Sequence, residues 1–246
     1  MHRTMKNVVV SSFFSLLLFS PVFMNGSSGK TVPFAVSSMH ASFNALKNAS
    51  VAVLYDSLRL EDFGLNEKAF RYAWRGFLKL AETGRVINTD YLTICDFSQS
   101  SRNKRMYVIN LTDMKLYKNT YVAHGRNSGR EFATSFSNKP ESHKSSLGFY
   151  VTRCVYYGQH GLSPRIDGLE KGINDKAMAR KIVIHGADYI GDEFLDENPF
   201  TGRSFGCPAV PSCERDEIIN TIKEGTCLFI YHPTNVYVSK SKILNG

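Results

Sequence analysis

The stretch GRSFGCPAV, residues 202–210, brings a serine, a glycine, a cysteine and a proline together within five positions. Its cysteine, Cys207, suits four roles: a nucleophile, a metal ligand, half of a disulfide or a small buried hydrophobe. A cysteine nucleophile needs a base and hydrogen-bond donors for the developing oxyanion. Gly206 lets the backbone approach a substrate closely or take a positive φ, and Pro208 stiffens the chain after the cysteine. These residue types favour a reactive cysteine in a tight turn.

A base for Cys207 must come from the seven histidines of the chain. His185 ends RKIVIH, residues 180–185, a short run with the composition of a β-strand. A side chain at the end of a strand is held rigidly and still opens to a cleft. His185 is therefore the predicted base, although a histidine at this position fits a structural role as well.

Together, GRSFGCPAV and IVIHGADY, residues 182–189, resemble the His-Gly…Ser-x-Gly-Cys signature of L,D-transpeptidases with a YkuD-like catalytic domain. The resemblance is nearest to the murein L,D-transpeptidase branch, in which Pro-Ala follows the cysteine. Ser-x-Gly-Cys alone is a weak signal, whereas the ordered set with its histidine first is specific. The resemblance covers roughly residues 60–235 and includes the stretches DFSQSS, AHGRNSG, FSNKPESHKSSLGFY, GLSPRIDGLEKGIND and GTCLFIYHP.

The resemblance implies a role for each residue of the two motifs. Cys207 would be the nucleophile and His185 its base. The backbone carbonyl of Gly186 would orient the other imidazole nitrogen of that histidine. Ser204 and Gly206 occupy the small positions of the motif, and the amides of Gly206 and Cys207 would stabilise the oxyanion.

The resemblance also implies a groove for the donor peptide, and we place His124, His160 and Tyr189 along it as substrate-binding candidates. Each histidine lies in a stretch shared with the family, but a lone histidine fits a structural position too. Two departures from the family concern recognition. Phe205 stands where better-known members carry His, Arg or Lys, and Pro208-Ala209 stand where they carry a hydrophobic residue and then Arg or Asn. These departures leave the nucleophile in place and affect the acceptor side.

The function that the resemblance implies is that of a transferase in cell wall biogenesis. It is a peptidoglycan L,D-transpeptidase that forms 3-3 cross-links through a thioester on Cys207, with no metal and no organic cofactor. Water in place of the acceptor amine would give an L,D-carboxypeptidase on the same site, and a cell-wall-binding module without turnover is the non-enzymatic alternative. A zinc site of His124, His160, His185 and Cys207 lacks C-x-x-C or H-E-x-x-H spacing. A papain-like peptidase has its cysteine before its histidine, the reverse of the order here.

The chain after Tyr91 has the pattern of a β protein. Short runs rich in Val, Ile, Tyr, Phe and Thr are separated by Asn, Asp, Ser and Gly, and predict the strands YLTICDF, KRMYVIN, LYKNTYV, GFYVTRCVYY, RKIVIH and TCLFIYH. KRMYVIN and LYKNTYV flank a hairpin connection. Regular helices do not alternate with these runs, which excludes a doubly wound parallel sheet. We predict a mainly β catalytic domain over residues 90–240, for which the resemblance implies a YkuD-like β-sandwich.

A small helical region is predicted over residues 40–88. Its clearest helix begins after the N-cap Asn66 and has an apolar stripe of Phe70, Ala73, Trp74, Phe77, Leu78 and Ala81. A later helix is predicted to be capped by Ser212 and to end at Gly225. Residues 191–203 contain four acidic residues and predict an irregular loop, either a lid or a solvated surface loop.

Residues 1–28 have the pattern of a secretory signal peptide, with Arg3 and Lys6 before an apolar stretch and a small-residue exit. We therefore expect an exported protein of the periplasm or cell envelope, with no membrane span after signal removal. The net charge of +8 favours an anionic partner such as cell-wall polymer, anionic lipid or an acidic peptide, and the resemblance implies peptidoglycan stem peptides as the partner. The basic residues are scattered and no binding motif is present, which argues against nucleic acid. In an oxidising compartment, an odd count of five cysteines leaves at least one thiol unpaired within the chain.

Overall fold

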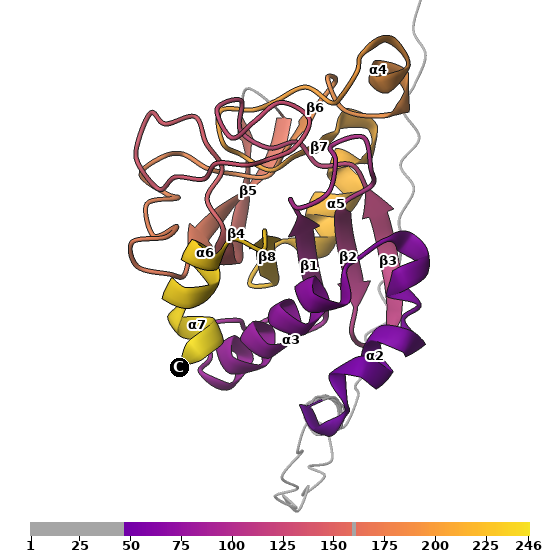
Figure 1. Ribbon diagram of the computed structural model, residues 1–246, viewed down its shortest axis with the longest axis vertical. Coiled ribbons are helices and arrows are strands. Elements are labelled where there is room, and N and C mark those ends of the chain that lie inside the picture. The colour runs from indigo at the N-terminus through magenta and orange to yellow at the C-terminus, as the bar shows by residue number, and fades with distance from the viewer. Residues whose placement is uncertain (1–46, 159–160) are drawn as a thin grey trace, which may run out of the picture.

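A six-stranded sheet forms the centre of the computed structural model, which describes residues 47–158 and 161–246 (Figure 1). The strand order is β3–β2–β1–β8–β4–β5, and a separate two-stranded sheet pairs β6 (His185–Ala187) with β7 (Ala209–Pro211). The prediction of a sheet-dominated fold with a small helical region is confirmed. The predicted signal peptide, residues 1–28, and His160 lie outside the described residues. The strands of the large sheet are β1 (Tyr91–Asp96), β2 (Met106–Asn110), β3 (Lys115–Thr120), β4 (Gly148–Gly158), β5 (Gly161–Gly168) and β8 (Cys227–Tyr231).

The central strands of the large sheet are covered on both faces. Every residue of β2 and β8 is buried, which is the pattern of strands with packing on each side. Helix α3 (Glu67–Glu82) contacts β1 and β8, and helix α5 (Arg215–Ile222) contacts β1 and β5. The sheet is mixed, because β1 pairs with β8 in parallel while β1 with β2 and β4 with β8 are antiparallel. The predicted hairpin is confirmed by the antiparallel pairing of β2 with β3.

The N-terminal helices cover the sheet from the side seen at the bottom of Figure 1. Helix α2 (Val51–Ser57) and the 3-10 turn η1 (Leu60–Phe63) lead into α3, which begins as predicted: Asn66 Oδ1 accepts the Lys68 N–H at 2.9 Å. Most of the predicted apolar stripe of α3 is buried, and its last two residues, Leu78 and Ala81, are half-buried. A Cβ on its Gly76 would lie 2.0 Å from Cζ of Phe149 on β4, so only glycine lets the helix approach the sheet this closely.

Two predicted boundaries after residue 180 are wrong. The run at 180–185 is not a strand that ends at His185, because β6 (His185–Ala187) begins there and Val183 makes only an isolated bridge with Arg165. The Val183 N–H lies 3.5 Å from Cys207 Sγ instead of extending a ladder. The predicted helix at Ser212 starts later as well. After β7 (Ala209–Pro211) the chain forms the 3-10 turn η2 (Ser212–Glu214), and α5 follows it. Ser212 is thus the first residue of η2, and the N-cap position of α5 is Glu214.

Two further elements complete the described chain. The segment predicted as an irregular loop contains the short exposed helix α4 (Asp192–Glu197), which stands at one corner of the molecule in Figure 1. At the C-terminus, helix α7 (Lys242–Asn245) packs against α3, and helix α6 (Asn235–Lys240) packs against α7. Within the part of the chain that the structure describes, no helix has both the length and the apolar character needed to cross a membrane.

Candidate active site

The two sequence motifs meet where the small sheet forms. Strands β6 and β7 run parallel with His185 opposite Ala209, and the His185 N–H lies 3.4 Å from the Pro208 carbonyl oxygen. The strand pairing thus places the histidine beside the chain that leaves the cysteine. Both residues line one pocket of about 510 Å³, together with Tyr156, Gly158, Ser163, Arg180, Lys181, Ile182, Val183, Tyr189, Arg203, Ser204 and Phe205.

Cys207 is a half-buried free thiol. Its Sγ lies 3.5 Å from the Val183 N–H donor nitrogen and 3.9 Å from the carbonyl oxygen of Lys181. Burial raises the pKa of this thiol, while the Val183 N–H and the charge of Arg180 oppose the rise. The resting form at neutral pH is therefore the thiol, which needs a base to become a nucleophile. The other four cysteines are also free, which gives no support to a disulfide on Cys207: Cys95, Cys154, Cys213 and Cys227.

His185 is held by its own strand. It is only 4% exposed, and its Nδ1 lies 3.0 Å from the carbonyl oxygen of Gly186. A carbonyl can only accept, so Nδ1 carries the proton in this contact. In the neutral ring the lone pair then resides on Nε2, which is the arrangement of a histidine that takes up a proton at that nitrogen.

Ser204 shapes the turn that carries the cysteine. Its hydroxyl donates to the carbonyl of Cys207 at 2.6 Å and accepts the N–H of Gly206 at 3.0 Å. Gly206 has φ +124°, a conformation that L side chains rarely adopt. The Gly206 amide is therefore directed to Ser204, whereas the Cys207 N–H has no hydrogen-bond partner among residues 47–158 and 161–246. Of the two backbone amides that the resemblance implies as oxyanion donors, only the Cys207 N–H has no acceptor within the described residues.

A second segment supports this turn from behind. Ser145 Oγ accepts the N–H of Gly125 at 3.0 Å and donates to the carbonyl of Gly206 at 3.3 Å. A Cβ on Gly125 would lie 2.9 Å from the Cα of Gly206, so the two glycines allow the backbones to touch. The shared stretches AHGRNSG and FSNKPESHKSSLGFY thus have a physical task, which is to hold the cysteine turn in place.

The substrate-binding candidates fall in different places. Tyr189 lines the pocket, and burial raises its pKa to about 12. His124 does not line it: the ring is fully buried, with Nδ1 2.8 Å from Arg105 Nη2 and Phe97 packed at its edge. Burial first, and the Arg105 charge second, lower the pKa of His124 to about 3. His124 therefore lies outside the pocket that Cys207 and His185 share.

Two features of the pocket were not predicted from the sequence. Arg180 lies in the pocket wall, and no local signal distinguishes it from the other scattered basic residues. Phe205, noted only as a departure, is 64% exposed, and its ring packs against the Arg126 guanidinium at 4.6 Å and the His143 ring at 4.7 Å. No pattern in the sequence predicts that residues 126 and 143 pack against Phe205, because only the fold joins these loops. No three His, Cys, Asp or Glu side chains of the described residues form a group that could hold a metal.

Comparison with protein-family models assigns the chain to one family. The family model described as L,D-transpeptidase catalytic domain matches residues 61–231. No curated protein has a sequence that matches this chain significantly.

Solved structures with a similar arrangement include three L,D-transpeptidases. One from Mycobacterium smegmatis is 10% identical over 58% of this chain and 59% of its own, with a TM-score of 0.35. A variant from Enterococcus faecium is 14% identical over 58% and 50%, with a TM-score of 0.32. One from Xylanimonas cellulosilytica is 13% identical over 73% and 93%, with a TM-score of 0.33. The chain thus spans little more than half the length of the first two.

Proposed function

The chain belongs to the L,D-transpeptidase catalytic-domain family, and from that premise we propose that it is a cysteine-dependent peptidoglycan L,D-transpeptidase. The donor is a tetrapeptide stem that ends in a diamino acid and D-Ala. Cys207 forms a thioester with the donor, and a second stem resolves it to a 3-3 cross-link. The observation that carries the proposal is the shared pocket of His185 and Cys207, in which the histidine has its Nδ1 fixed on the Gly186 carbonyl.

The acylation step starts with a proton transfer. His185 Nε2 takes the proton of the Cys207 thiol, and Sγ attacks the carbonyl carbon of the diamino acid at its bond to D-Ala. The carbonyl oxygen becomes an oxyanion, which accepts the Cys207 N–H. When the intermediate collapses, the C–N bond breaks and His185 returns its proton to the leaving amine of D-Ala. The products of this half-reaction are free D-Ala and a thioester.

The second half-reaction reverses these roles. The side-chain amine of a neighbouring stem attacks the thioester carbonyl and gives up a proton to His185. The C–S bond then breaks, and the histidine protonates the departing thiolate. An amide between two stems forms, and the Cys207 thiol is restored. Water as the acceptor would release a tripeptide acid instead, which is the alternative L,D-carboxypeptidase activity on the same residues. Neither route calls for a metal or an organic cofactor.

The proposed substrate sets the proposed location. Peptidoglycan lies outside the cytoplasm, so a protein that acts on it must be exported to the periplasm or cell envelope. The positive net charge of +8 supports association with a substrate that carries carboxylates. The partner is then the stem peptide of the wall.

Mass spectrometry of products tests the proposal. Purified protein is incubated with disaccharide-tetrapeptide, beside Cys207→Ala and the control Cys213→Ala, which removes an exposed cysteine outside the pocket. We expect 3-3 dimers and D-Ala from the native protein and Cys213→Ala, and a loss of about 10³-fold or more from Cys207→Ala. Tripeptide and D-Ala without dimers would identify the carboxypeptidase. Absence of any Cys207-dependent product would overturn the enzymatic proposal in favour of a wall-binding module.

A further inference from the structure

Arg180 is a half-buried cation held by neutral groups. Its Nη1 donates to the Ser137 carbonyl at 2.9 Å and to Ser146 Oγ at 2.6 Å. Its Nη2 donates to the Lys144 carbonyl at 2.5 Å and to Ser142 Oγ at 3.4 Å. No carboxylate of residues 47–158 or 161–246 pairs with it, although a charge removed from water is normally compensated by an opposite one. The wall of the pocket therefore holds a positive charge that lacks a permanent partner.

The position of this charge points to the anion that it serves. A Cβ on Gly206 would lie 3.0 Å from Arg180 Nη2, so the guanidinium packs against the residue that directly precedes Cys207. Burial raises the pKa of the Cys207 thiol and lowers the pKa of the Arg180 guanidinium, and the electrostatic interaction between the two groups opposes both shifts. These are the effects of a cation beside a potential thiolate.

We propose that Arg180 is a positioning residue that supplies the fixed positive charge for the thiolate of Cys207. The inference rests on the proposed function, because it assigns Arg180 to the nucleophile of that reaction. Four of the five guanidinium N–H groups already have acceptors in the protein. The side chain is therefore not organised to grip a substrate carboxylate through a bidentate contact. The positive charge of Arg180 instead stabilises the Cys207 thiolate through space, and this interaction needs no further hydrogen bond.

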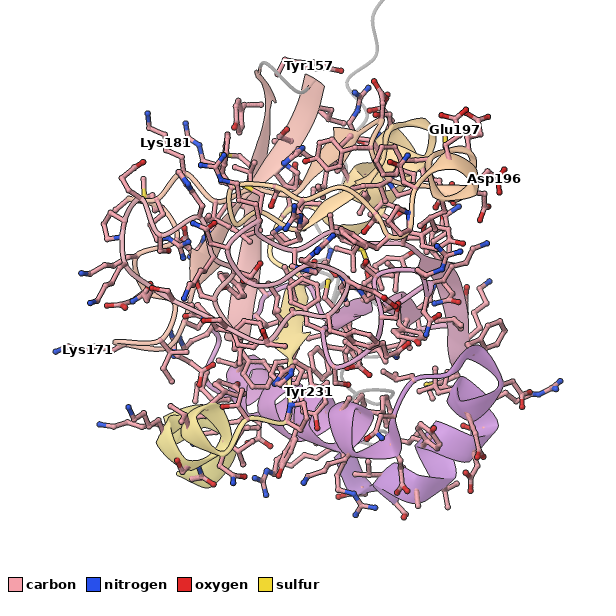
Figure 2. All side chains as sticks on the ribbon, turned by 45° about the horizontal axis from the view of Figure 1, so that its top comes forward. Tyr157, Lys171, Lys181, Asp196, Glu197 and Tyr231 are labelled. Carbon is pink, nitrogen blue, oxygen red and sulfur yellow. The ribbon has the colours of Figure 1, made fainter. Side chains whose placement is uncertain are left out.

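The other charged groups of the pocket do not replace Arg180. Lys181 is exposed, and Figure 2 places it on the outer surface of the molecule. Arg203 directs its Nη1 to the carbonyls of Arg126 and Gly129, at 3.3 and 3.1 Å. The remaining titratable residues of the lining are Tyr156, His185 and Tyr189, and the lining of this pocket contains no Asp or Glu. Of the cations there, Arg180 is the one whose charge acts on the Cys207 thiol.

Alkylation kinetics test the proposal without any peptidoglycan. The rate at which iodoacetamide modifies Cys207 is followed from about pH 5 to pH 10 by peptide mass spectrometry, which separates it from the other cysteines. In Arg180→Met we expect the apparent pKa of Cys207 to rise by about one unit, so that the rate at neutral pH falls about tenfold. The control Arg165→Met removes an exposed cation from the adjoining pocket and should leave the rate unchanged.

Arg180→Lys separates charge from structure, because it keeps the positive charge and loses most of the four hydrogen bonds. Recovery of the native alkylation profile in Arg180→Lys, but not in Arg180→Met, supports the proposal. Equal losses in both variants, or an unchanged profile in a folded Arg180→Met, would overturn it in favour of a purely structural role for the hydrogen bonds. A shifted alkylation profile in a protein that makes no 3-3 dimers would instead contradict only the proposed function.

Discussion

At the scale of single residues, the reactivity that we propose for Cys207 depends on its neighbours. Burial alone would leave the thiol protonated and unreactive. Ser204 fixes the turn on both sides of Gly206, and His185 is fixed through the Gly186 carbonyl. The backbone amide of Cys207 is thereby presented as a donor. The site therefore depends on polar groups that never contact the sulfur.

Replacing Ser204 tests this dependence. Ser204→Ala loses the hydrogen bonds to the Cys207 carbonyl and from the Gly206 amide, and a misplaced nucleophile costs about 10–100-fold in kcat. We expect KM to change little, and the free energy of unfolding to fall by about 1–2 kcal/mol. Steady-state kinetics with disaccharide-tetrapeptide and thermal unfolding measure the two effects. Ser204→Thr, which keeps a hydroxyl, should recover activity, and Ser212→Ala, which removes no cap bond, should behave as the native protein. A native kcat in Ser204→Ala would contradict this account.

The candidate site could be predicted from the sequence only where its residues are adjacent in the chain. The Ser-x-Gly-Cys turn and the preceding His-Gly pair are local patterns, and the fold brings them into one pocket. Arg180 lines the pocket, and Arg126 and His143 pack against Phe205 beside it, only because the fold brings separate loops together, and isolated basic residues in the sequence give no signal of this. His124 has the same sequence context as a functional histidine, a following glycine, and only its burial beside Arg105 distinguishes it.

At the scale of secondary-structure elements, helices and strands with a clear local sequence pattern were predicted correctly. Helix α3 has a cap and an apolar stripe, and the β2–β3 hairpin has two β-rich runs around a short connection. The strand predicted for residues 180–185 is absent, because a run of apolar β-branched residues looks the same in the sequence whether or not a partner strand pairs with it. There, contacts with Cys207 and an isolated bridge replace a regular ladder. The C-terminal helices α6 and α7 were not predicted, because helices this short do not show a periodic spacing of apolar residues in the sequence.

The C-terminal helices are joined to the sheet through one buried acid, Glu170. Its carboxylate accepts the Phe149 N–H at 2.9 Å, the Tyr237 hydroxyl at 3.1 Å and the Ser241 hydroxyl. Burial outweighs these hydrogen bonds and raises the pKa of Glu170. The folded state therefore binds the proton more tightly than the unfolded chain does, which makes this anchor sensitive to pH.

Glu170→Gln should reveal that sensitivity. We expect it to destabilise the fold by about 1–3 kcal/mol, because an amide NH₂ then faces hydrogen-bond donors. A raised folded pKa contributes stability below the unfolded pKa and loses it as pH rises through the folded value. The stability advantage of the native protein over Glu170→Gln should therefore shrink over the pH range above the unfolded value of about 4.3. Thermal unfolding across this range is the measurement. Glu197→Gln, on exposed α4 (Figure 2), is the control and should show no such trend; an advantage that grows with pH would contradict the argument.

At the scale of the whole molecule, the charge distribution connects the fold to its proposed substrate. The net charge is +8, and Arg180, Lys181 and Arg203 line the pocket without an acid in its wall. A field of this sign raises the local concentration of anionic ligands. The acidic side chains of α4, including Asp196 and Glu197, are exposed on a separate part of the surface (Figure 2). Attraction of a carboxylate-bearing stem peptide is thus a property of the molecule as well as of its pocket.

Added salt should then weaken substrate binding more than it slows the chemical step. Between about 20 mM and 500 mM salt the Debye length falls from about 20 Å to about 4 Å, so we expect KM for disaccharide-tetrapeptide to rise several-fold while kcat stays nearly constant. Alkylation of Cys207 by neutral iodoacetamide should change little over the same range. Substitution of two exposed lysines distinguishes the charge of the pocket from the net charge of the protein. Lys171 and Lys181 are both labelled in Figure 2, and only Lys181 lines the pocket. Lys181→Met should raise KM at low salt about two- to threefold and Lys171→Met should not. Equal effects of the two substitutions would assign the attraction to the net charge alone, and a KM independent of salt would remove electrostatic attraction from the account.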